Sequence, residues 1–328
     1  MTRKFSIPFT WNADTTEFIQ YVKEKRESID SVYFSLPYIL GVDSHFTANP
    51  SLAQNSQEVL DFRDIKTVDF VAKSYQVVKR VALLNAVIYS CSVQEYEKRM
   101  KEIVIPFLQQ FKIEAVVVTH FFVARWIKEA LPEIEIQTSC NDFQFTLPQM
   151  KIWREELGVE LFNPPREAAR MPGMLKQFHD AGFKLKVLVN DTCLFGCPYH
   201  VAHAAMNSIH GFFFRPGGEG CTLRKPENFF KSNWVLPRWL PLLDDTVDVY
   251  KIVGRGYPLE LVTKITDAYI ELNDAVSINE LVGHTGTNYN YFDKRVPCSV
   301  IPDKLLSCQR MSCDSCRECD KLTKEWLL

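Results

Sequence analysis

Alternation of strand-like and helix-like segments is the feature that most constrains the fold of this 328-residue chain. Short apolar runs such as 115–118 are followed by segments such as 123–131, in which apolar residues recur with the period of an α-helix. About eight such units succeed one another with short connections. The predicted strands are 5–9, 32–36, 81–88, 115–118, 134–137, 159–162, 186–189 and 247–253, and the predicted helices include 65–78 and 96–111.

This alternation predicts a parallel sheet covered by helices, which is either a closed barrel or a doubly wound open sheet. No GxGxxG motif follows the first strand, and this lowers the expectation of a dinucleotide-binding open sheet. We therefore expect an α/β fold of the (β/α)8 TIM-barrel type, regular or irregular, over residues 1–290. A Cys-rich metal-binding tail is expected over 291–328.

The composition is that of an ordinary globular protein, with 46% hydrophobic and 24% charged residues. A net charge of -2 provides no global positive field, so a small organic substrate is slightly preferred over RNA. The N-terminal sequence lacks the apolar region of a signal peptide, and no apolar run approaches the roughly 18 residues that span a bilayer. We expect a cytoplasmic protein without membrane association.

Polar residues follow the ends of many predicted strands. In a barrel these ends converge on one face, where catalytic groups collect. An equally good explanation for each one is that any soluble strand ends in polar residues. The candidate substrate-binding residues at this face are Tyr33, Asn85, Ser139, Asn141 and Asn190.

Four further side chains are candidates for catalysis. Lys251 and Arg255 could bind an anionic substrate, since Arg offers a planar donor fork, although a salt bridge between strand and helix is an equal alternative. Glu167 could act as an acid or a base, or could neutralise Arg170. His120 could donate protons, but a hydrogen-bonded histidine at the barrel rim explains it as well. The sequence contains neither a Ser/His/Asp order nor an HExxH motif, so no hydrolytic machinery is visible in it.

Ten cysteines are present, and most lie from Cys193 onward. In a cytosol that keeps thiols reduced, such clustering favours metal ligation over disulfides. The first group follows the seventh predicted strand. It consists of Cys193, Cys197 and Cys221. The second group has the spacing C-x4-C-x2-C-x2-C, so four thiols could wrap one metal centre. It consists of Cys308, Cys313, Cys316 and Cys319.

The block from Ala115 to Cys197 resembles peptidase family U-32 in the order of its features. These are the strand AVVV, a helix before LPEIEIQTS, the helix in QMKIWREELGVELF, the segment NPPREA, and a strand that opens onto cysteines. The run VDVYKIVGRGYPLELVTKITDAY resembles the family's segment with a KIxGR motif, which is the most specific element. The resemblance covers roughly residues 80–275.

Despite the peptidase name, this resemblance implies an iron–sulfur enzyme that hydroxylates RNA bases or quinone precursors without oxygen. Several members hold a cluster on four cysteines, and the first cysteine group of this chain matches those positions best. The fourth ligand would be Cys298, Cys140 or a tail cysteine. Thiolates suit both iron–sulfur clusters and zinc, and His200, three residues after Cys197, would complete a zinc-like site. The spacing CxxxCxxH also matches part of a radical-SAM signature, with His200 in place of the third cysteine.

We therefore expect an enzyme that depends on one or two [4Fe–4S] clusters, with zinc as the alternative cofactor. It would hydroxylate a small-molecule precursor or an RNA base, or perform a related redox step. The tail group would hold a second cluster that passes electrons to the first, with a structural zinc knuckle as the alternative. An electron-donor protein or partner subunit is a possible partner. The alternative functions are a metal-stabilised binding or accessory protein without catalysis and, third, a peptidase.

Overall fold

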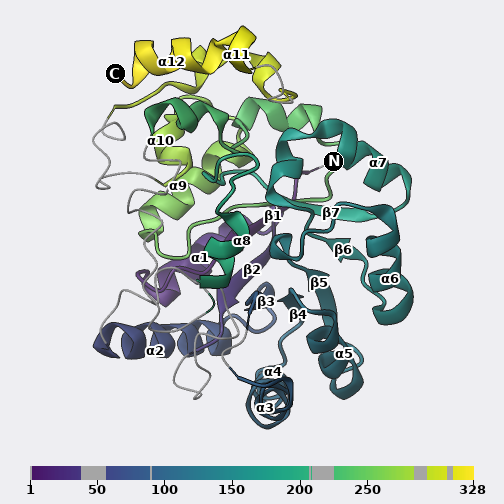
Figure 1. Ribbon diagram of the computed structural model, residues 1–328. Coiled ribbons are helices and arrows are strands. Elements are labelled where there is room, and N and C mark those ends of the chain that lie inside the picture. The colour runs from purple at the N-terminus through teal and green to yellow at the C-terminus, as the bar shows by residue number, and fades with distance from the viewer. Residues whose placement is uncertain are drawn as a thin grey trace.

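The computed structural model describes residues 2–37, 57–88, 91–206, 208, 225–283, 294–308 and 313–328, with 57–61 and 206 described in their backbone alone. Eight parallel strands close into a barrel in chain order, β1 to β8, which confirms the predicted TIM-type fold (Figure 1). The strands are β1 Phe5–Pro8, β2 Ile29–Ser35, β3 Lys79–Leu84, β4 Ala115–Val118, β5 Glu135–Thr138, β6 Leu161–Phe162, β7 Lys184–Leu188 and β8 Val249–Lys251.

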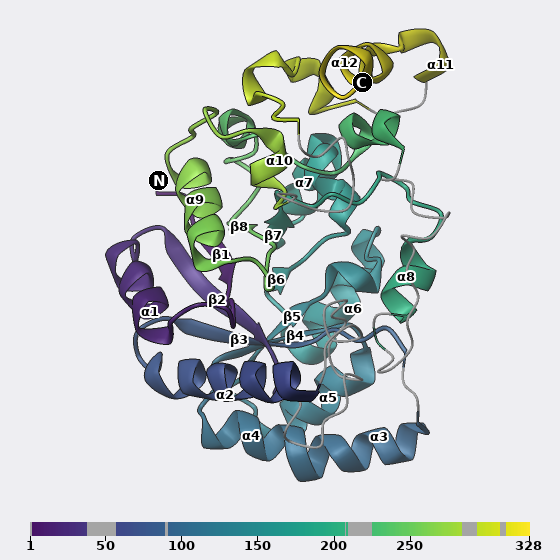
Figure 2. The ribbon, with the colours of Figure 1, turned by 90° about the vertical axis from the view of Figure 1, so that its left-hand side faces the viewer.

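Helices surround the barrel, as the two ribbon views show from perpendicular directions (Figures 1 and 2). The α-helices are α1 Thr15–Glu24, α2 Gln57–Lys73, α3 Val93–Arg99, α4 Ile105–Gln110, α5 Phe121–Ala130, α6 Leu147–Leu157, α7 Pro172–Asp180, α8 His200–Met206, α9 Leu259–Ile270, α10 Ile278–Leu281, α11 Cys313–Cys316 and α12 Glu318–Trp326. Short turns of helix join them, among them η4 Met100–Val104, η5 Cys140–Asp142, η6 Arg166–Arg170, η8 Pro226–Lys231, η9 Pro237–Leu242, η11 Cys298–Val300 and η12 Asp303–Leu305.

Two predicted helices differ from the observed ones for local reasons. The helix expected over 65–78 ends earlier, at Lys73, and Gln76 adopts a left-handed backbone with φ 60°, which an α-helix cannot include. The helix expected over 96–111 is divided into α3, the π-helical turn η4 and α4. Pro at the first turn of α4 lacks an N–H for the preceding turn, which explains why the regular hydrogen-bond pattern is interrupted there.

Strand residues alternate between the barrel interior and the helical layer. Val32 and Phe34 of β2 belong to the large core between strands and helices, whereas Tyr33 between them packs inside the barrel. The interior is partly polar. The amine of Lys186 on β7 donates to Gln137 Oε1 at 2.9 Å, and burial lowers the pKa of Lys186 to about 7. The Ser6 and Ser31 hydroxyls lie 3.5 Å from the same amine.

The Cys-rich tail packs against η8 through α12. An ion pair of 3.3 Å joins Lys231 at the end of η8 to Asp320 of α12. The predicted boundary at residue 290 lies outside the described residues. None of the described helices is long and apolar enough to cross a membrane.

Candidate functional site

A cavity of about 440 Å³ opens at the carboxyl ends of the strands. Because parallel strands of a barrel end on the same face, residues far apart in the sequence meet there. Five of the nine residues predicted for catalysis or substrate binding line this cavity. They are Tyr33, Asn85, Asn141, Lys251 and Arg255.

The other four predicted residues have contacts elsewhere. The Ser139 hydroxyl accepts a hydrogen bond from the N–H of Asn141 at 3.1 Å, which shapes the turn after β5. Asn190 is fully buried and ties strand ends together. Its Oδ1 accepts from Val253 N at 2.7 Å, and its Nδ2 donates to Leu281 O at 3.0 Å. The contacts of Ser139 and Asn190 therefore favour the alternative to substrate binding, in which they are polar residues at strand ends with a structural role.

His120 also fits its structural explanation. Its Nε2 lies 3.1 Å from Val87 O, and its ring lies 5.4 Å from that of Phe122. Burial lowers the pKa of His120, so its imidazole is held in the neutral form. A hydrogen-bonded rim histidine is the role that these contacts describe.

Glu167 faces His200, rather than Arg170. Its Oε1 lies 3.8 Å from His200 Nδ1, and both side chains are buried. Burial raises the pKa of Glu167, and burial with the nearby Arg166 lowers the pKa of His200 to about 4. His200 lines the cavity and packs edge-on against Phe143, while its Nε2 is buried without a hydrogen-bond partner among the described residues. Among the described residues, this nitrogen is therefore available to coordinate a metal.

Arg166 is a cavity residue that the sequence did not single out as a ligand-binding group. Its guanidinium donates to Cys193 Sγ at 3.1 Å and to Asn141 Oδ1 at 3.0 Å, and it lies 3.5 Å from Asp191 Oδ2. Burial and Asp191 raise the pKa of Cys193 to about 12, against the opposing effect of Arg166. The Cys193 thiol is therefore protonated at neutral pH unless a metal displaces its proton. The only sequence signal for Arg166 and Asp191 is their place just after a strand.

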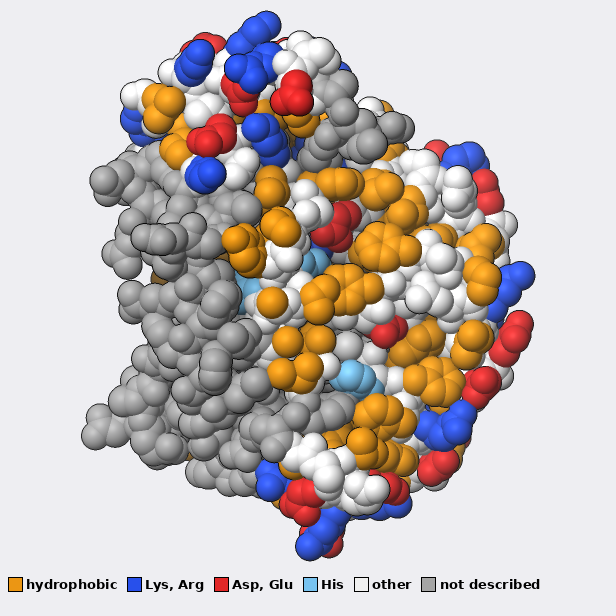
Figure 3. Space-filling model, viewed as in Figure 1, with side chains coloured by type: hydrophobic (Ala, Val, Ile, Leu, Met, Phe, Trp, Pro, Cys, Tyr) orange, Lys and Arg blue, Asp and Glu red, His pale blue; other side chains and the backbone are white. Residues whose placement is uncertain are grey.

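The surface beside the cavity is apolar. Phe145, Tyr199 and Val201 are all exposed, and Tyr199 and Val201 flank the cavity residue His200. Hydrophobic side chains gather on the face of the molecule that carries α8 (Figure 3). An organic ligand in the cavity would meet charged groups inside and apolar groups at this surface.

The first cysteine group is described in part. Cys193 lines the cavity and Cys197 follows it in the same loop, whereas Cys221 lies outside the described residues. Of the candidates for a fourth ligand, Cys140 lines the same cavity as Cys193.

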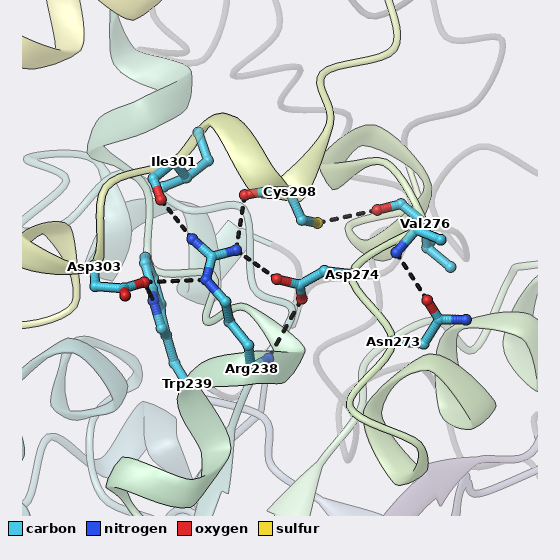
Figure 4. Close-up of polar contacts among 9 residues, drawn as sticks. Arg238, Trp239, Asn273, Asp274, Val276, Cys298, Ile301 and Asp303 are labelled. Carbon is cyan, nitrogen blue, oxygen red and sulfur yellow. Dashed lines mark hydrogen bonds and ion pairs between the residues drawn. The ribbon is translucent and has the colours of Figure 1, made fainter.

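Cys298 belongs to a different network (Figure 4). Its buried thiol donates to Val276 O at 3.0 Å, and burial raises its pKa to about 12. Its carbonyl accepts from Arg238, whose guanidinium also pairs with Asp274 at 2.5 Å. These contacts hold η11 against the segment after α9, so they favour a structural role for Cys298.

The four tail cysteines line one small cavity of about 50 Å³, beside Phe230 and Leu305. Within the described ranges, no group of three or more His, Cys, Asp and Glu side chains is arranged to hold a metal ion. These two observations are compatible, because protonated thiols attract one another weakly and close on a common point only when a metal replaces their protons. The backbone determines which thiols can meet, and it brings these four to one cavity. The donor set fits a four-thiolate centre.

No protein-family model matches the chain. An uncharacterised protease of Methanocaldococcus jannaschii is 24% identical over 205 residues, which are 59% of this chain and 61% of the relative's length. The solved U32 peptidase Mk0906 has a TM-score of 0.54 at 15% identity, and the match covers 79% of this chain and 94% of that chain. A probable 3-DHS dehydratase from Bacillus anthracis, AsbF, has a TM-score of 0.46 at 10% identity over 82% of this chain and 98% of that chain.

The match to Mk0906 shows a shared barrel fold, and the archaeal relative adds similarity in sequence. Both agree with the family resemblance carried by the KIxGR segment. The comparisons thus show a barrel fold shared with a U32 peptidase and similarity in sequence to a protein named as a protease, of which this chain covers about three fifths.

Proposed function

We propose that this chain is an iron–sulfur enzyme that carries out a redox modification, of the hydroxylation type, on a small organic substrate in the cavity at the barrel mouth. The observation that carries the proposal is the convergence of Cys308, Cys313, Cys316 and Cys319 on one cavity. All-cysteine coordination is the usual ligation of such clusters.

The residues that would hold clusters fall into two sets. The tail set is the four-cysteine group. The mouth set is Cys193, Cys197 and Cys221, with Cys140 or the unpartnered His200 Nε2 as the further ligand. A cluster would supply one-electron transfer.

The protein's own groups support this use of the mouth. Arg166 donates a hydrogen bond to Cys193 Sγ, and hydrogen bonds to cluster sulfurs are one means by which proteins set reduction potential. The 440 Å³ cavity has the volume of a small-molecule site. The net charge of -2 favours a small substrate over RNA.

Anaerobic purification followed by reduction with dithionite tests the proposal. We expect a coloured protein whose broad visible absorption bleaches on reduction and returns on reoxidation, since thiolate–iron charge transfer depends on the iron oxidation state. A colourless protein with stoichiometric zinc would contradict the redox function and would support the accessory-protein alternative.

The remaining alternative is a peptidase, which the name of the archaeal relative suggests. A peptidase assay on the same preparation distinguishes it from the redox enzyme. Cleavage of casein or gelatin by metal-free protein, at a rate unchanged by cluster loading, would support a peptidase. We expect no cleavage above a buffer control.

A further inference from the structure

The cavity at the barrel mouth contains a buried cation with an unusual environment. Lys251, the last residue of β8, is 7% exposed and lines the cavity. Its Nζ lies 4.6 Å from the centroid of the Tyr33 ring, and no hydrogen bond or ion pair joins it to another described residue. An ammonium group has three hydrogen-bond donors and no acceptor, so these donors are left for a ligand in the cavity that Lys251 lines.

The ring beneath this ammonium is fixed in place. The Tyr33 hydroxyl donates to Ile252 O at 2.7 Å, so the tyrosine cannot turn its oxygen toward Lys251. The amine therefore rests on the aromatic face and directs its donors at the cavity. Cation–π contact offsets only part of the cost of removing an ammonium from water.

The neighbouring charges do not neutralise Lys251. Arg255, in the same lining, donates to Ser35 Oγ at 2.7 Å, and Arg166 lies beside Asp191, the one carboxylate among the described residues that line the cavity. Burial, together with the nearby Arg255 and Arg166, lowers the pKa of Lys251 to about 8, against an opposing effect of Cys140. The described lining of the cavity therefore carries more positive than negative charge before a ligand enters.

We propose that the substrate of the mouth cavity carries an anionic group, a carboxylate or a phosphate, and that the Lys251 ammonium is the residue that binds it. The inference rests on the proposed function in treating this cavity as the substrate site, and it adds the chemical class of the substrate. An oxyanion above the Tyr33 ring would accept the unused Lys251 donors and would remove the excess positive charge. Charge-assisted bonds of this kind are the stronger hydrogen bonds in proteins.

Titration calorimetry with two probes, inorganic phosphate and benzoate, tests this assignment at constant ionic strength. Lys251→Met removes the charge and keeps the length of the side chain. We expect it to weaken binding of the preferred probe about ten- to hundredfold. Lys176→Met is the matched control, because Lys176 is exposed and pairs with Asp180 on α7, so its loss changes net charge without touching the cavity. Preference for phosphate would identify a phosphate ester, and preference for benzoate would identify a carboxylate.

The pH dependence of benzoate binding provides a second readout, since the charge of benzoate is constant near neutrality. Bound anion favours protonated Lys251, so affinity should be constant below the free-protein pKa of about 8 and fall about tenfold per pH unit above it. Lys251→Arg should bind with a flat profile, because a guanidinium stays protonated. Among the described residues, the other titratable groups around the cavity or close to Lys251 are Tyr33, Cys140, Arg166, Lys186, Asp191, Cys193, His200, His203, Arg255 and Tyr257.

Failure of the wild-type protein to bind either probe, or equal binding by Lys251→Met and wild type, would overturn the assignment. Iron content measured on the same samples separates this result from the cluster proposal. Anion binding that depends on Lys251 in a protein without iron would support the anion site and reject the redox function.

Discussion

Replacement of Arg170 by Met is expected to loosen the Cys-rich tail from the barrel. Arg170 is 2% exposed, and its guanidinium donates to Ser232 O at 3.0 Å, to Trp234 O at 2.8 Å and, through two nitrogens, to Leu305 O. It also lies 5.1 Å and 5.3 Å from the rings of Trp234 and Trp239. One side chain therefore joins η6, the loop after η8 and Leu305 of η12, which lies three residues before the first tail cysteine.

The magnitude follows from these contacts. The loss of the donor to three carbonyl groups lowers the free energy of unfolding by about 1 kcal/mol for each group. The loss of the two cation–π contacts lowers it by about 1 kcal/mol more. Removal of a buried charge offsets part of this loss, so we expect the free energy of unfolding to fall by about 3 kcal/mol. Urea unfolding measures the change.

Arg125→Met is the matched control, since Arg125 pairs with Glu156 at the surface and its loss should cost less than about 1 kcal/mol. Amide hydrogen exchange should also rise more in 294–308 and 313–328 of Arg170→Met than in the barrel strands. A loss of stability no larger than that of the control, with unchanged exchange in the tail, would refute this reasoning.

Three further predictions concern the rest of the chain. Gly254 has φ +139°, and a Cβ there would lie 2.3 Å from Tyr257 Cδ2, so Gly254→Ala should lose about 1–3 kcal/mol in urea unfolding whereas Gly173→Ala, with open space around it, should not. Burial opposes the shift, but hydrogen bonds from Lys264 and Ser277 lower the pKa of Glu280 from 4.5 to about 2. The stability that Glu280 contributes should therefore be complete above pH 4.5 and disappear as the pH falls toward 2. Glu280→Gln should remove this dependence from urea midpoints measured against pH, and an unchanged profile would contradict it. Cys298→Ala should lower stability by about 1–2 kcal/mol and leave iron content unchanged, while a fall in iron would make Cys298 a ligand.

The order of strands and helices could be predicted because each unit carries its own periodicity. The segment 115–118 is an uninterrupted apolar run between polar residues, and β4 has these bounds. The strand expected at 159–162 is shorter in the structure, Leu161–Phe162, because its extent depends on pairing with β5 and β7. Pairing partners far along the chain are not visible in local sequence.

The site was predictable to the level of strand ends and no further. Asn85 and Asn190 both follow strands, yet Asn85 lines the cavity and Asn190 bonds backbone groups of Val253, just after β8, and of Leu281 in α10. The direction of a side chain after a strand depends on the loop that follows it. The contact of Arg166 could not be predicted for the same reason, because its hydrogen bond to Cys193 joins η6 to the loop after β7, 27 residues further along the chain.

Iron and acid-labile sulfide per chain, in wild type and in the double variant Cys313→Ser/Cys316→Ser, test the central claim most directly. Cys91→Ser, which alters a cysteine outside both groups, is the control. In the wild-type protein and in the control, we expect as much sulfide as iron per chain. In the double variant, we expect the iron content and the sulfide content to fall. Stoichiometric zinc without sulfide in the wild-type protein, or full iron content in the double variant, would contradict the claim that the tail cysteines hold an iron–sulfur cluster.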